Sequence, residues 1–323
     1  MILHSQSANE FQRQRILVTG ASGFIGSQLC RRLFDAGGDV YAISRSPRPE
    51  GDNSVYWSVG DLANIKTVRQ LFSSTKPDVI FHLASHVSGS RDLSLVLPTF
   101  QSNLASTVNL LTVATEMGCR RIVIVGSMEE PSQDDADATP CSPYAASKWS
   151  STAYGRMFHT LYKTPIVIAR VFMTYGPGQR DTQKLIPYVI LSLLQGTVPR
   201  LSSGSRNVDW IYVNDVVNGL LAAGCKDGVD GCTIDLGSGE MVSVRMVVEQ
   251  LVRLLGSSIE PHFGALPDRP VEQERRANTA DALAQLGWRP ETQLVEGLES
   301  TVDWYKRNGT ALIGPTNFRP NSP

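Results

Sequence analysis

A short apolar run leads directly into three glycines separated by two residues each, and a segment of helical period follows. The run is Ile16–Thr19, and the first glycine is Gly20. Glycines here permit a tight turn, let backbone amides approach a phosphate group, and allow the helix to pack closely on the strand. Because a helix N-terminus carries partial positive charge, the pattern predicts a binding site for the pyrophosphate of a dinucleotide. The residues expected to line it are Gly20, Ser22, Gly23, Phe24, Ile25 and Gly26.

Runs rich in Val and Ile alternate with segments of helical period in the first half of the chain. The runs are continuously apolar, which predicts strands buried on both faces and therefore an α/β fold with a doubly wound parallel sheet of the Rossmann type. Right-handed crossovers should bring the carboxyl ends of the first and fourth runs together. The expected strands are Ile16–Thr19, Val40–Ser44, Val79–Leu83, Ile122–Val125 and Ile166–Val171, with helices at Phe24–Ala36, Ile65–Ser73, Thr99–Met117 and Pro143–Leu161.

The regular alternation ends after Val171, where a second lobe is expected. We predict a dinucleotide-binding domain over residues 14–171, to which residues 207–228 return, and a smaller mixed α/β substrate lobe over residues 172–306. The polar residues 1–13 and the residues 309–323, rich in Pro, Asn and Gly, are predicted to be flexible tails. The later elements are expected at Leu185–Gln195, Asp209–Val213, Thr233–Leu236 and Val244–Leu255.

The composition argues against several classes of function. Among 323 residues, 30 basic side chains balance 31 acidic ones without a basic block, so neither nucleic acid nor an anionic membrane is an expected partner. No apolar run reaches the ~20 residues of a membrane span, and no signal peptide is evident, so we expect a cytoplasmic protein. The five cysteines and five histidines lack metal-binding spacing, which predicts no metal site.

The end of the second expected strand bears on which dinucleotide binds. Ser44 and Arg45 occupy it, and Arg48 follows closely. NAD enzymes usually place a carboxylate there for the ribose hydroxyls, whereas a guanidinium can pair with a 2′-phosphate. The sequence therefore favours NADP, and NAD stays open if these arginines are solvated. Asp61 and Leu62 are expected to bind the amino group and the edge of the adenine.

A phenol and an ammonium lie one helical turn apart further along the chain. Ser142 can cap a helix that begins at Pro143, which places Tyr144 and Lys148 on one face of its first turns. Lowering a phenol pKa from near 10 to about 7 requires roughly 4 kcal/mol, which an ammonium and an oxidised nicotinamide can supply. Ser127, at the carboxyl end of a strand, can bond the reacting oxygen.

Two carboxylates follow Ser127. Glu129 is either a catalytic base or a solvated charge, and both readings stay open. For Glu130 we favour a solvated acidic loop that continues to Asp137.

Together these residues resemble the extended short-chain dehydrogenase/reductase family, in its nucleotide-sugar branch of epimerases, dehydratases and 4-ketoreductases. The likeness covers roughly residues 15–306. It implies a catalytic triad of Ser127, Tyr144 and Lys148. The motifs in family order are the glycine turn, Asp61-Leu62, His82-Leu83-Ala84, Asn103, Ser127, Tyr144/Lys148, Tyr175–Gly178, Tyr212–Val216, Gly237–Glu240 and Leu286–Pro290.

The resemblance also implies further contacts and an assembly. Relatives often dimerise through the helices expected here at Thr99–Met117 and Pro143–Leu161, so a homodimer is expected. Its apolar patch would comprise Trp149, Tyr154 and Met157. Further cofactor-binding residues would be Leu83, Ala84, Ser85 and Asn103, and the substrate-binding residues would be Ser88, Arg206 and Arg269.

The segment after the fourth run separates the reactions within this branch. Dehydratases commonly carry an acid and a Glu there, where this chain has Met128 and Glu129. Epimerases usually have small residues, and a Ser-small-Glu pattern resembles reductases of 4-keto-6-deoxyhexoses. With an NADP-like second strand, the leading hypothesis is NADPH-dependent reduction of a nucleotide-linked 4-keto-6-deoxyhexose in deoxysugar biosynthesis, with Tyr144 as proton donor.

Two alternatives remain. One is a redox-neutral NAD(P)-dependent 4-epimerase or 4,6-dehydratase, and the other is a dinucleotide-sensing regulator on the same fold. Two departures from the family also weaken the sugar assignment: Met173 replaces an amide that contacts the diphosphate, and Val208 replaces an arginine for which Arg206 can substitute. A ketone outside the nucleotide sugars therefore stays open as the substrate.

Overall fold

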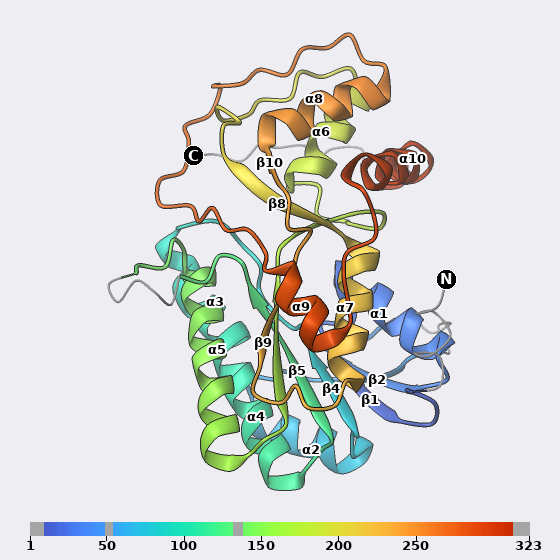
Figure 1. The fold of residues 1–323 in the computed structure, drawn as a ribbon, viewed down its shortest axis with the longest axis vertical. Helices are drawn as coiled ribbons and strands as arrows, with labels where there is room; N and C mark the ends of the chain where they lie inside the picture. The colour runs from blue at the N-terminus through green and yellow to red at the C-terminus, as the bar shows by residue number, and fades with distance from the viewer. Residues whose placement is uncertain (1–9, 49–53, 132–137, 313–323) are drawn as a thin grey trace. The chain divides into compact units, whose positions relative to one another are not determined.

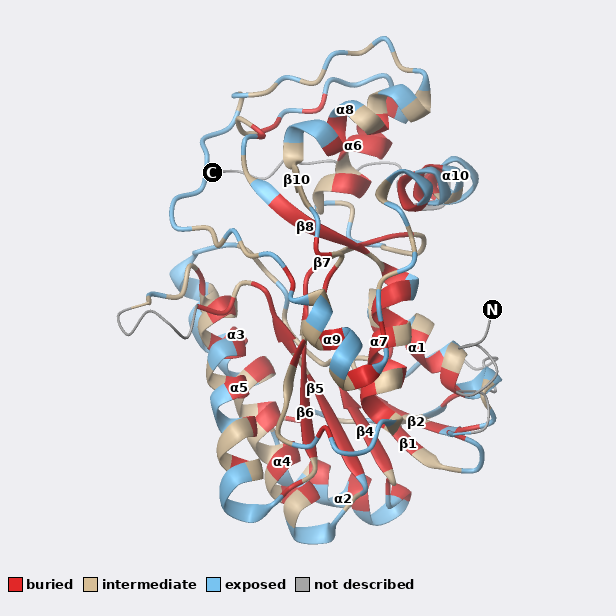
Figure 2. Cartoon of the chain, in the orientation of Figure 1, coloured by how far each residue is buried: buried red, intermediate tan, exposed pale blue. Residues whose placement is uncertain are grey.

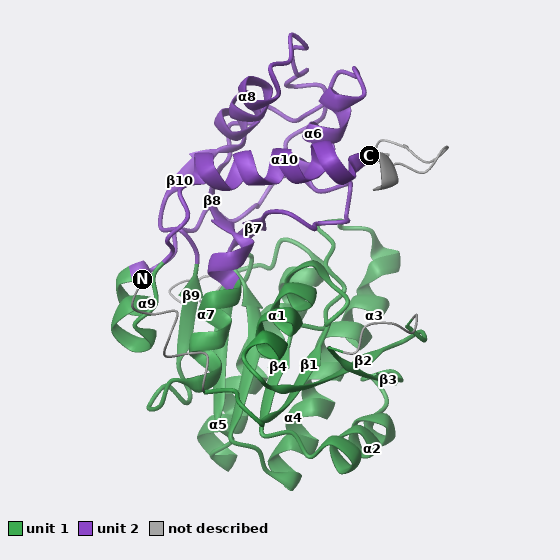
Figure 3. Cartoon of the chain, turned by 90° about the vertical axis from the view of Figure 1, so that its right-hand side faces the viewer, with its two compact units in different colours: residues 1–171, 217–236, 280–289 green, residues 172–216, 237–279, 290–323 purple. Residues whose placement is uncertain are grey.

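The computed structural model describes residues 10–48, 54–131 and 138–312, and the chain divides into two compact units (Figure 3). Unit 1 comprises residues 1–171, 217–236 and 280–289, and unit 2 comprises the rest. Of the segment 207–228, residues 217–228 belong to unit 1 and residues 207–216 to unit 2. The predicted tails at residues 1–9 and 313–323 lie outside the described residues.

Unit 1 is built on a seven-stranded parallel sheet in the order β3-β2-β1-β4-β5-β6-β9. Its central strands are buried along nearly their whole length (Figure 2), as their continuous apolar runs require. The Rossmann-type α/β fold expected from the sequence is confirmed. The strands are β1 (Arg15–Thr19), β2 (Asp39–Ser44), β3 (Tyr56–Val59), β4 (Val79–His82), β5 (Arg121–Ser127), β6 (Ile166–Val171) and β9 (Thr233–Leu236).

The neighbour of β1 differs from the expectation. Ile16 pairs with Val79 of β4, and Ile122 of the fourth expected run lies one strand further out, in β5. The fourth expected run is the fifth strand of the chain, because the sequence did not predict β3. This edge strand has no buried residue and therefore no apolar run that could reveal it in the sequence.

Helices cover both faces of this sheet (Figure 1). Helices α2, α4 and α5 lie on one face, and α1 and α7 lie on the other. The expected helix at Thr99–Met117 is interrupted: a π-helical turn at Phe100–Ala105 precedes its regular part. The helices are α1 (Phe24–Asp35), α2 (Ile65–Thr75), α3 (Val96–Thr99), α4 (Ser106–Met117), α5 (Pro143–Tyr162), α7 (Val213–Cys225) and α9 (Thr279–Leu286).

The residues just before β1 are part of the folded unit rather than of a flexible tail. Phe11 is fully buried, and its ring centroid lies 6.2 Å from that of Phe81 on β4. The amide of Arg13 also donates to the carbonyl of Gly37, at 2.9 Å. A single aromatic side chain in a polar stretch was a weak signal, and burying it outweighs the cost of ordering the segment.

Unit 2 has a small mixed sheet with three helices. Strand β8 (Asn207–Tyr212) lies in the middle, parallel to β7 (Met173–Tyr175) and antiparallel to β10 (Met241–Ser243). Asp209 is fully buried and accepts the amides of Ser238, Gly239 and Ala277. The helices are α6 (Leu185–Leu194), α8 (Val244–Leu255) and α10 (Leu294–Leu312).

The last helix corrects a second boundary. Residues 309–312 continue α10 to Leu312, so these four residues are helical where a flexible tail was predicted. Among the described residues, no helix combines the length and the apolar character that crossing a membrane would require.

Candidate active site

The glycine turn packs tightly against the loop that follows β4. Gly20 has a φ of +72°, and a Cβ added there would lie 2.7 Å from the amide nitrogen of Ala84. A Cβ added at Gly26 would overlap the carbonyl oxygen of Gly20. Both positions therefore exclude any side chain, as the predicted dinucleotide turn requires.

The N-terminus of α1 is free of a competing anion. Its N-cap is Gly23, and no side chain among the described residues caps it or adds an acidic charge to its first turn. The first amides of a helix lack intrahelical partners, so Phe24 and Ile25 can donate to a phosphate. The hydroxyl of Ser85, in the loop after β4, is buried and has no hydrogen-bond partner within the described part of the chain. These features fit a bound dinucleotide.

A buried histidine links the strand before the glycine turn to helix α4. His82 Nδ1 lies 2.7 Å from the hydroxyl of Thr19, and Nε2 lies 2.9 Å from that of Thr107. Burial, with a smaller contribution from the charge of Lys148, lowers the pKa of His82 to about 3. The neutral imidazole braces the turn, a role that sequence reasoning missed.

The residues predicted to contact the adenosine lie at the ends of β2 and β3. The Ser44 hydroxyl donates to the carbonyl of Ser46 at 2.6 Å, while Arg45 is exposed. The Arg48 guanidinium lies 5.2 Å from the centroid of the Trp57 ring, a cation–π contact. Among the described residues no carboxylate ends β2; Arg45 is exposed there, and Arg48 contacts Trp57.

The loop with Asp61 and Leu62 is held by a residue absent from the sequence prediction. The Asn109 amide of α4 donates to the carbonyls of Leu62 and Ala63 at 3.0 and 2.9 Å. Asp61 is exposed, and its carboxylate accepts the amide of Ala63. The isolated asparagine gave no signal because its partners are backbone atoms 46 and 47 residues away.

The structure brings Ser127, Tyr144 and Lys148 together. Ser127 ends β5, and Ser142 caps α5 by accepting the amide of Ala145 at 3.1 Å. The Tyr144 phenol lies near enough to the Ser127 side chain for that hydroxyl to lower its pKa. The Lys148 ammonium lies 5.9 Å from the centroid of the Tyr144 ring and donates to the carbonyl of Val125 at 2.8 Å.

The surroundings shift the pKa of both titratable groups. Burial raises the pKa of Tyr144; the Ser127 hydrogen bond opposes this, and the charges of Glu129 and Glu130 add to it. Burial lowers the pKa of Lys148 to about 8, against the charge of Glu130. In this state Tyr144 holds its proton, and Lys148 loses its charge in mildly alkaline solution.

The expectation of a solvated loop is wrong for Glu130. This side chain is 1% exposed, and its Oε1 accepts the amide of Ser127 at 2.7 Å. Gly126 leaves the necessary space, since a Cβ there would lie 2.6 Å from Oε1. The acidic residues from Asp134 to Asp137 lie outside the described residues.

Glu129 and Met128 differ in what they can contribute. Glu129 is half-buried, its amide donates to the Ser127 hydroxyl at 3.2 Å, and its charge raises the pKa of Tyr144. Its carboxylate therefore lies near the triad. Met128 is 2% exposed and belongs to the core. Its side chain cannot act as an acid, because a thioether has no proton to donate.

Asn103, expected to bind cofactor, has its side chain occupied. It accepts the amide of His86 at 2.6 Å and donates to the Ser147 hydroxyl at 2.9 Å. Asn103 lies in the π-helical turn, where the altered pitch re-aims side chains. It joins the loop after β4 to α5, which carries Tyr144.

The residues predicted to bind substrate divide between the units. Ser88 lies in unit 1, after β4, and accepts the amide of Ser90 at 3.2 Å. In unit 2, Arg206 pairs with Glu272 at 3.2 Å, and the half-exposed Arg269 lies 4.0 Å from the same carboxylate. Met173 packs against the apolar core of unit 2.

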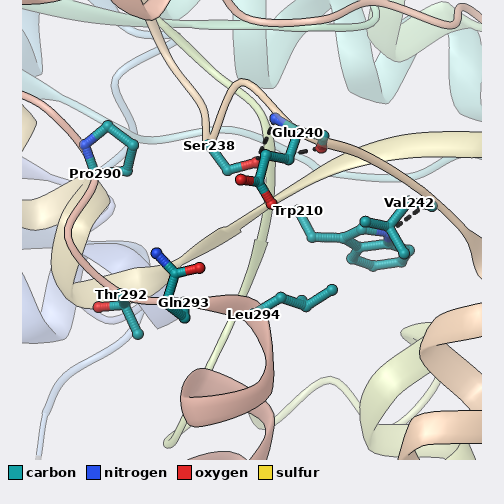
Figure 4. Close-up of a pocket in the computed structure, with 8 residues that line it drawn as sticks. All are labelled: Trp210, Ser238, Glu240, Val242, Pro290, Thr292, Gln293 and Leu294. Carbon is teal, nitrogen blue, oxygen red and sulfur yellow. Dashed lines mark hydrogen bonds between the residues drawn. The ribbon is translucent and has the colours of Figure 1, made fainter.

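Unit 2 also contains a cavity of about 140 Å³ (Figure 4). Its lining includes Trp210, Glu240 and Gln293, none of which the sequence predicted as a site residue. The indole nitrogen of Trp210 donates a hydrogen bond to the carbonyl of Val242, at 3.0 Å.

The glycine turn, the parallel sheet and the Ser-Tyr-Lys arrangement together define a nicotinamide-dependent enzyme of the extended short-chain dehydrogenase/reductase type. Residues 16–237 match the NAD dependent epimerase/dehydratase family, to which this chain belongs. The resemblance inferred from the sequence is thereby confirmed.

Similar proteins carry nucleotide-sugar names. The chain is 32% identical to a UDP-glucose 4-epimerase of Mycolicibacterium smegmatis, covering 90% of this chain and 98% of that protein. It is 29% identical to a dTDP-glucose 4,6-dehydratase of Haemophilus influenzae, covering 92% and 99%. A UDP-glucuronic acid 4-epimerase of Bacillus cereus, solved with UDP-glucuronic acid and NAD, superposes with a TM-score of 0.80 at 26% identity, covering 90% and 99%.

Proposed function

We propose that this enzyme is a redox-neutral nucleotide-sugar 4-epimerase that oxidises and then reduces one secondary alcohol of its substrate. The observation that carries the proposal is the position of Tyr144, next to the Ser127 side chain and with the Lys148 ammonium 5.9 Å from its ring centroid. The 32% identity to a UDP-glucose 4-epimerase supports the same reaction class.

Each triad residue has a separate task in this reaction. When bound, the nicotinamide supplies a hydride acceptor and donor at the reacting carbon. Tyr144, once ionised, takes the proton of the substrate hydroxyl and later returns it. Ser127 donates to the reacting oxygen, and the positive charge of Lys148 stabilises the phenolate of Tyr144.

Dehydration fits the residues less well than epimerisation. Losing water from C5 and C6 of a 4-keto sugar needs one group to remove a proton and another to protonate the departing hydroxyl. Glu129 can supply the base, but the neighbouring Met128 is buried and has no proton to donate. Glu130 is engaged by the amide of Ser127.

Ketone reduction with NADPH remains the second candidate. Its support is the end of β2, where Ser44 and Arg45 stand in place of a carboxylate. In a reductase, Tyr144 would donate its proton to the new alkoxide once per turnover, and the dinucleotide would exchange after each cycle.

A product assay separates these reactions. The enzyme is incubated with UDP-glucose, UDP-glucuronate and dTDP-glucose, and with a nucleotide-linked 4-keto-6-deoxyhexose plus NADPH. We expect a C4 epimer by chromatography and NMR, without net change in nicotinamide absorbance. If nicotinamide absorbance falls only in the reaction with the keto sugar and NADPH, the enzyme is a reductase. If dTDP-glucose gives a 4-keto-6-deoxy product, the enzyme is a dehydratase. No reaction with any of these would contradict the assignment.

Arg45 is proposed to recognise the 2′-phosphate of NADP. Replacing Arg45 with Ala should weaken NADP binding roughly tenfold to a hundredfold, the value of a charged hydrogen bond, and leave NAD binding unchanged. Isothermal titration with both dinucleotides measures this. Equal losses for both, or no loss, would mean that Arg45 is a solvated charge and that NAD is the cofactor.

A homodimer through α4 and α5 is also proposed. Trp149 and Tyr154 on α5 are 37% and 39% exposed, so two large aromatic side chains add apolar surface to the outer face of this helix. Trp149→Glu should convert the dimer to monomer in size-exclusion chromatography with light scattering. Phe34→Glu, at an exposed position on α1, should leave the dimer intact. A monomeric unsubstituted protein would refute the proposal.

A further inference from the structure

Behind the triad lies a carboxylate that the proposed reaction does not use. Glu130 is buried, and it closes the turn after β5 in both directions. Its amide donates to the carbonyl of Ser127 at 3.1 Å, while its carboxylate accepts the amide of Ser127 at 2.7 Å. Glu130 therefore holds both backbone groups of Ser127, the residue whose hydroxyl lies near Tyr144.

The charges around Glu130 come from every element packed against it. Helix α5 contributes Lys148 and Arg156, and β6 contributes Arg170; the charge of Glu130 acts on all three. A second carboxylate, Asp235 of β9, pairs with Arg170 at 2.8 Å. Beyond Lys148, His82 of β4 is neutral, and the charges of Glu129 and Glu130 both act on Tyr144.

Burial raises the pKa of Glu130, while the hydrogen bond from the Ser127 amide and the charges of Arg170 and Lys148 act in the opposite direction and favour the ionised carboxylate. The charge of Glu130 acts on three cations, of which Arg170 also pairs with Asp235, so a neutral Glu130 would leave Lys148 buried with little compensation. An uncompensated buried ammonium sheds its proton, because low dielectric penalises the charged form. Lys148 donates only to the neutral carbonyl of Val125 among the partners in the described structure.

We propose that Glu130 is a positioning residue: its buried carboxylate fixes the Ser127 turn and keeps the ammonium of Lys148 charged beside Tyr144. The inference rests on the proposed function for its effect on turnover. It concerns this chain's own residues, and its effect on Lys148 can be observed without substrate.

The sign of the pH effect follows from the direction in which Glu130 acts. Its negative charge raises the pKa of both Tyr144 and Lys148. Glu130→Gln removes that charge, keeps the size of the side chain and retains an acceptor for Ser127. With the oxidised nicotinamide bound, whose positive charge lowers the pKa of Tyr144, ionisation of Tyr144 would set the acid limb and that of Lys148 the alkaline limb. Both limbs should therefore move to lower pH in the variant, each by about 0.5–1 unit.

The first experiment measures kcat and KM against pH for the unsubstituted enzyme and for Glu130→Gln. We expect both limbs to shift downward, with kcat at mildly alkaline pH reduced more than KM is changed. Glu130→Leu, which also strands the Ser127 amide, should lose roughly tenfold to a hundredfold in kcat/KM. Asp230→Asn is the control, since it removes a carboxylate from buried Arg121 at the opposite end of β5 and should leave the pH profile unchanged.

The second experiment is independent of turnover. In protein labelled with carbon-13 at the lysine ε position, the Lys148 signal is assigned with Lys148→Arg and titrated. Its pKa should fall in Glu130→Gln and stay constant in Asp230→Asn. A fall without turnover of any nucleotide sugar would leave this inference standing and the proposed function wrong. An unchanged titration or pH profile in Glu130→Gln would overturn the inference.

Stability decides the matter if Glu130→Gln folds poorly. Removing the cation as well, in Glu130→Gln/Lys148→Met, should restore part of the lost melting temperature, because the charge that needed compensation is gone. A double variant no more stable than Glu130→Gln would show that Glu130 does not compensate Lys148.

Discussion

Tyr144→Phe should reduce kcat roughly a thousandfold while leaving the fold and KM nearly unchanged. The substitution removes the hydroxyl next to Ser127, the group proposed to exchange a proton with the substrate oxygen. The phenyl ring stays in place beside Lys148, so packing is conserved. Initial rates, with a thermal melt as the check on folding, measure the effect.

The matched control for this prediction lies on the same helix. Tyr162→Phe removes a phenol hydroxyl from a side chain that is 55% exposed at the end of α5 and contacts Phe158. It should retain full activity. Turnover by Tyr144→Phe within a few-fold of the unsubstituted enzyme would exclude Tyr144 as the proton-transfer group.

Gly26→Ala should destabilise the protein by roughly 3 kcal/mol and abolish measurable dinucleotide binding. The new Cβ would overlap the carbonyl oxygen of Gly20, a backbone atom held in a turn that cannot move aside without opening the phosphate site. Urea unfolding followed by circular dichroism gives the stability, and calorimetric titration gives the affinity.

Gly155→Ala provides the comparison, because it is also a glycine within a helix. Its Cβ would meet the terminal methyl of Ile124 at 3.2 Å, a flexible group, so stability should change by no more than about 1 kcal/mol. If Gly26→Ala bound dinucleotide normally and unfolded at the same urea concentration, the close approach at this turn would not be required.

Local patterns were sufficient wherever function depends on neighbours in the chain. The glycine turn is a strand, three glycines and a helix in sequence, and the pair Tyr144 and Lys148 needs only helical spacing. Five of the seven parallel strands were predicted from apolar runs in the first half of the chain, and β9 from a later one. The half-exposed edge strand β3 had no such run.

Residues whose role depends on distant partners were missed or misread. Glu130 reads as one acid among several, yet it is buried because Gly126 makes room and because Lys148 and Arg170 supply positive charge. His82 and Asn109 act through partners on other elements. No spacing rule relates such positions.

The sequence by itself determined the Rossmann fold and the glycine turn, because each follows from periodicity or from spacing within one strand–turn–helix unit, and its resemblance to the family pointed to Ser127, Tyr144 and Lys148 as the triad. Only the tertiary structure decided the neighbours of β1, the buried state of Phe11 and the surroundings of the triad. Burial and pairing of charge depend on segments that the fold brings together, and the free energy of a buried carboxylate is set by those segments rather than by its neighbours in sequence.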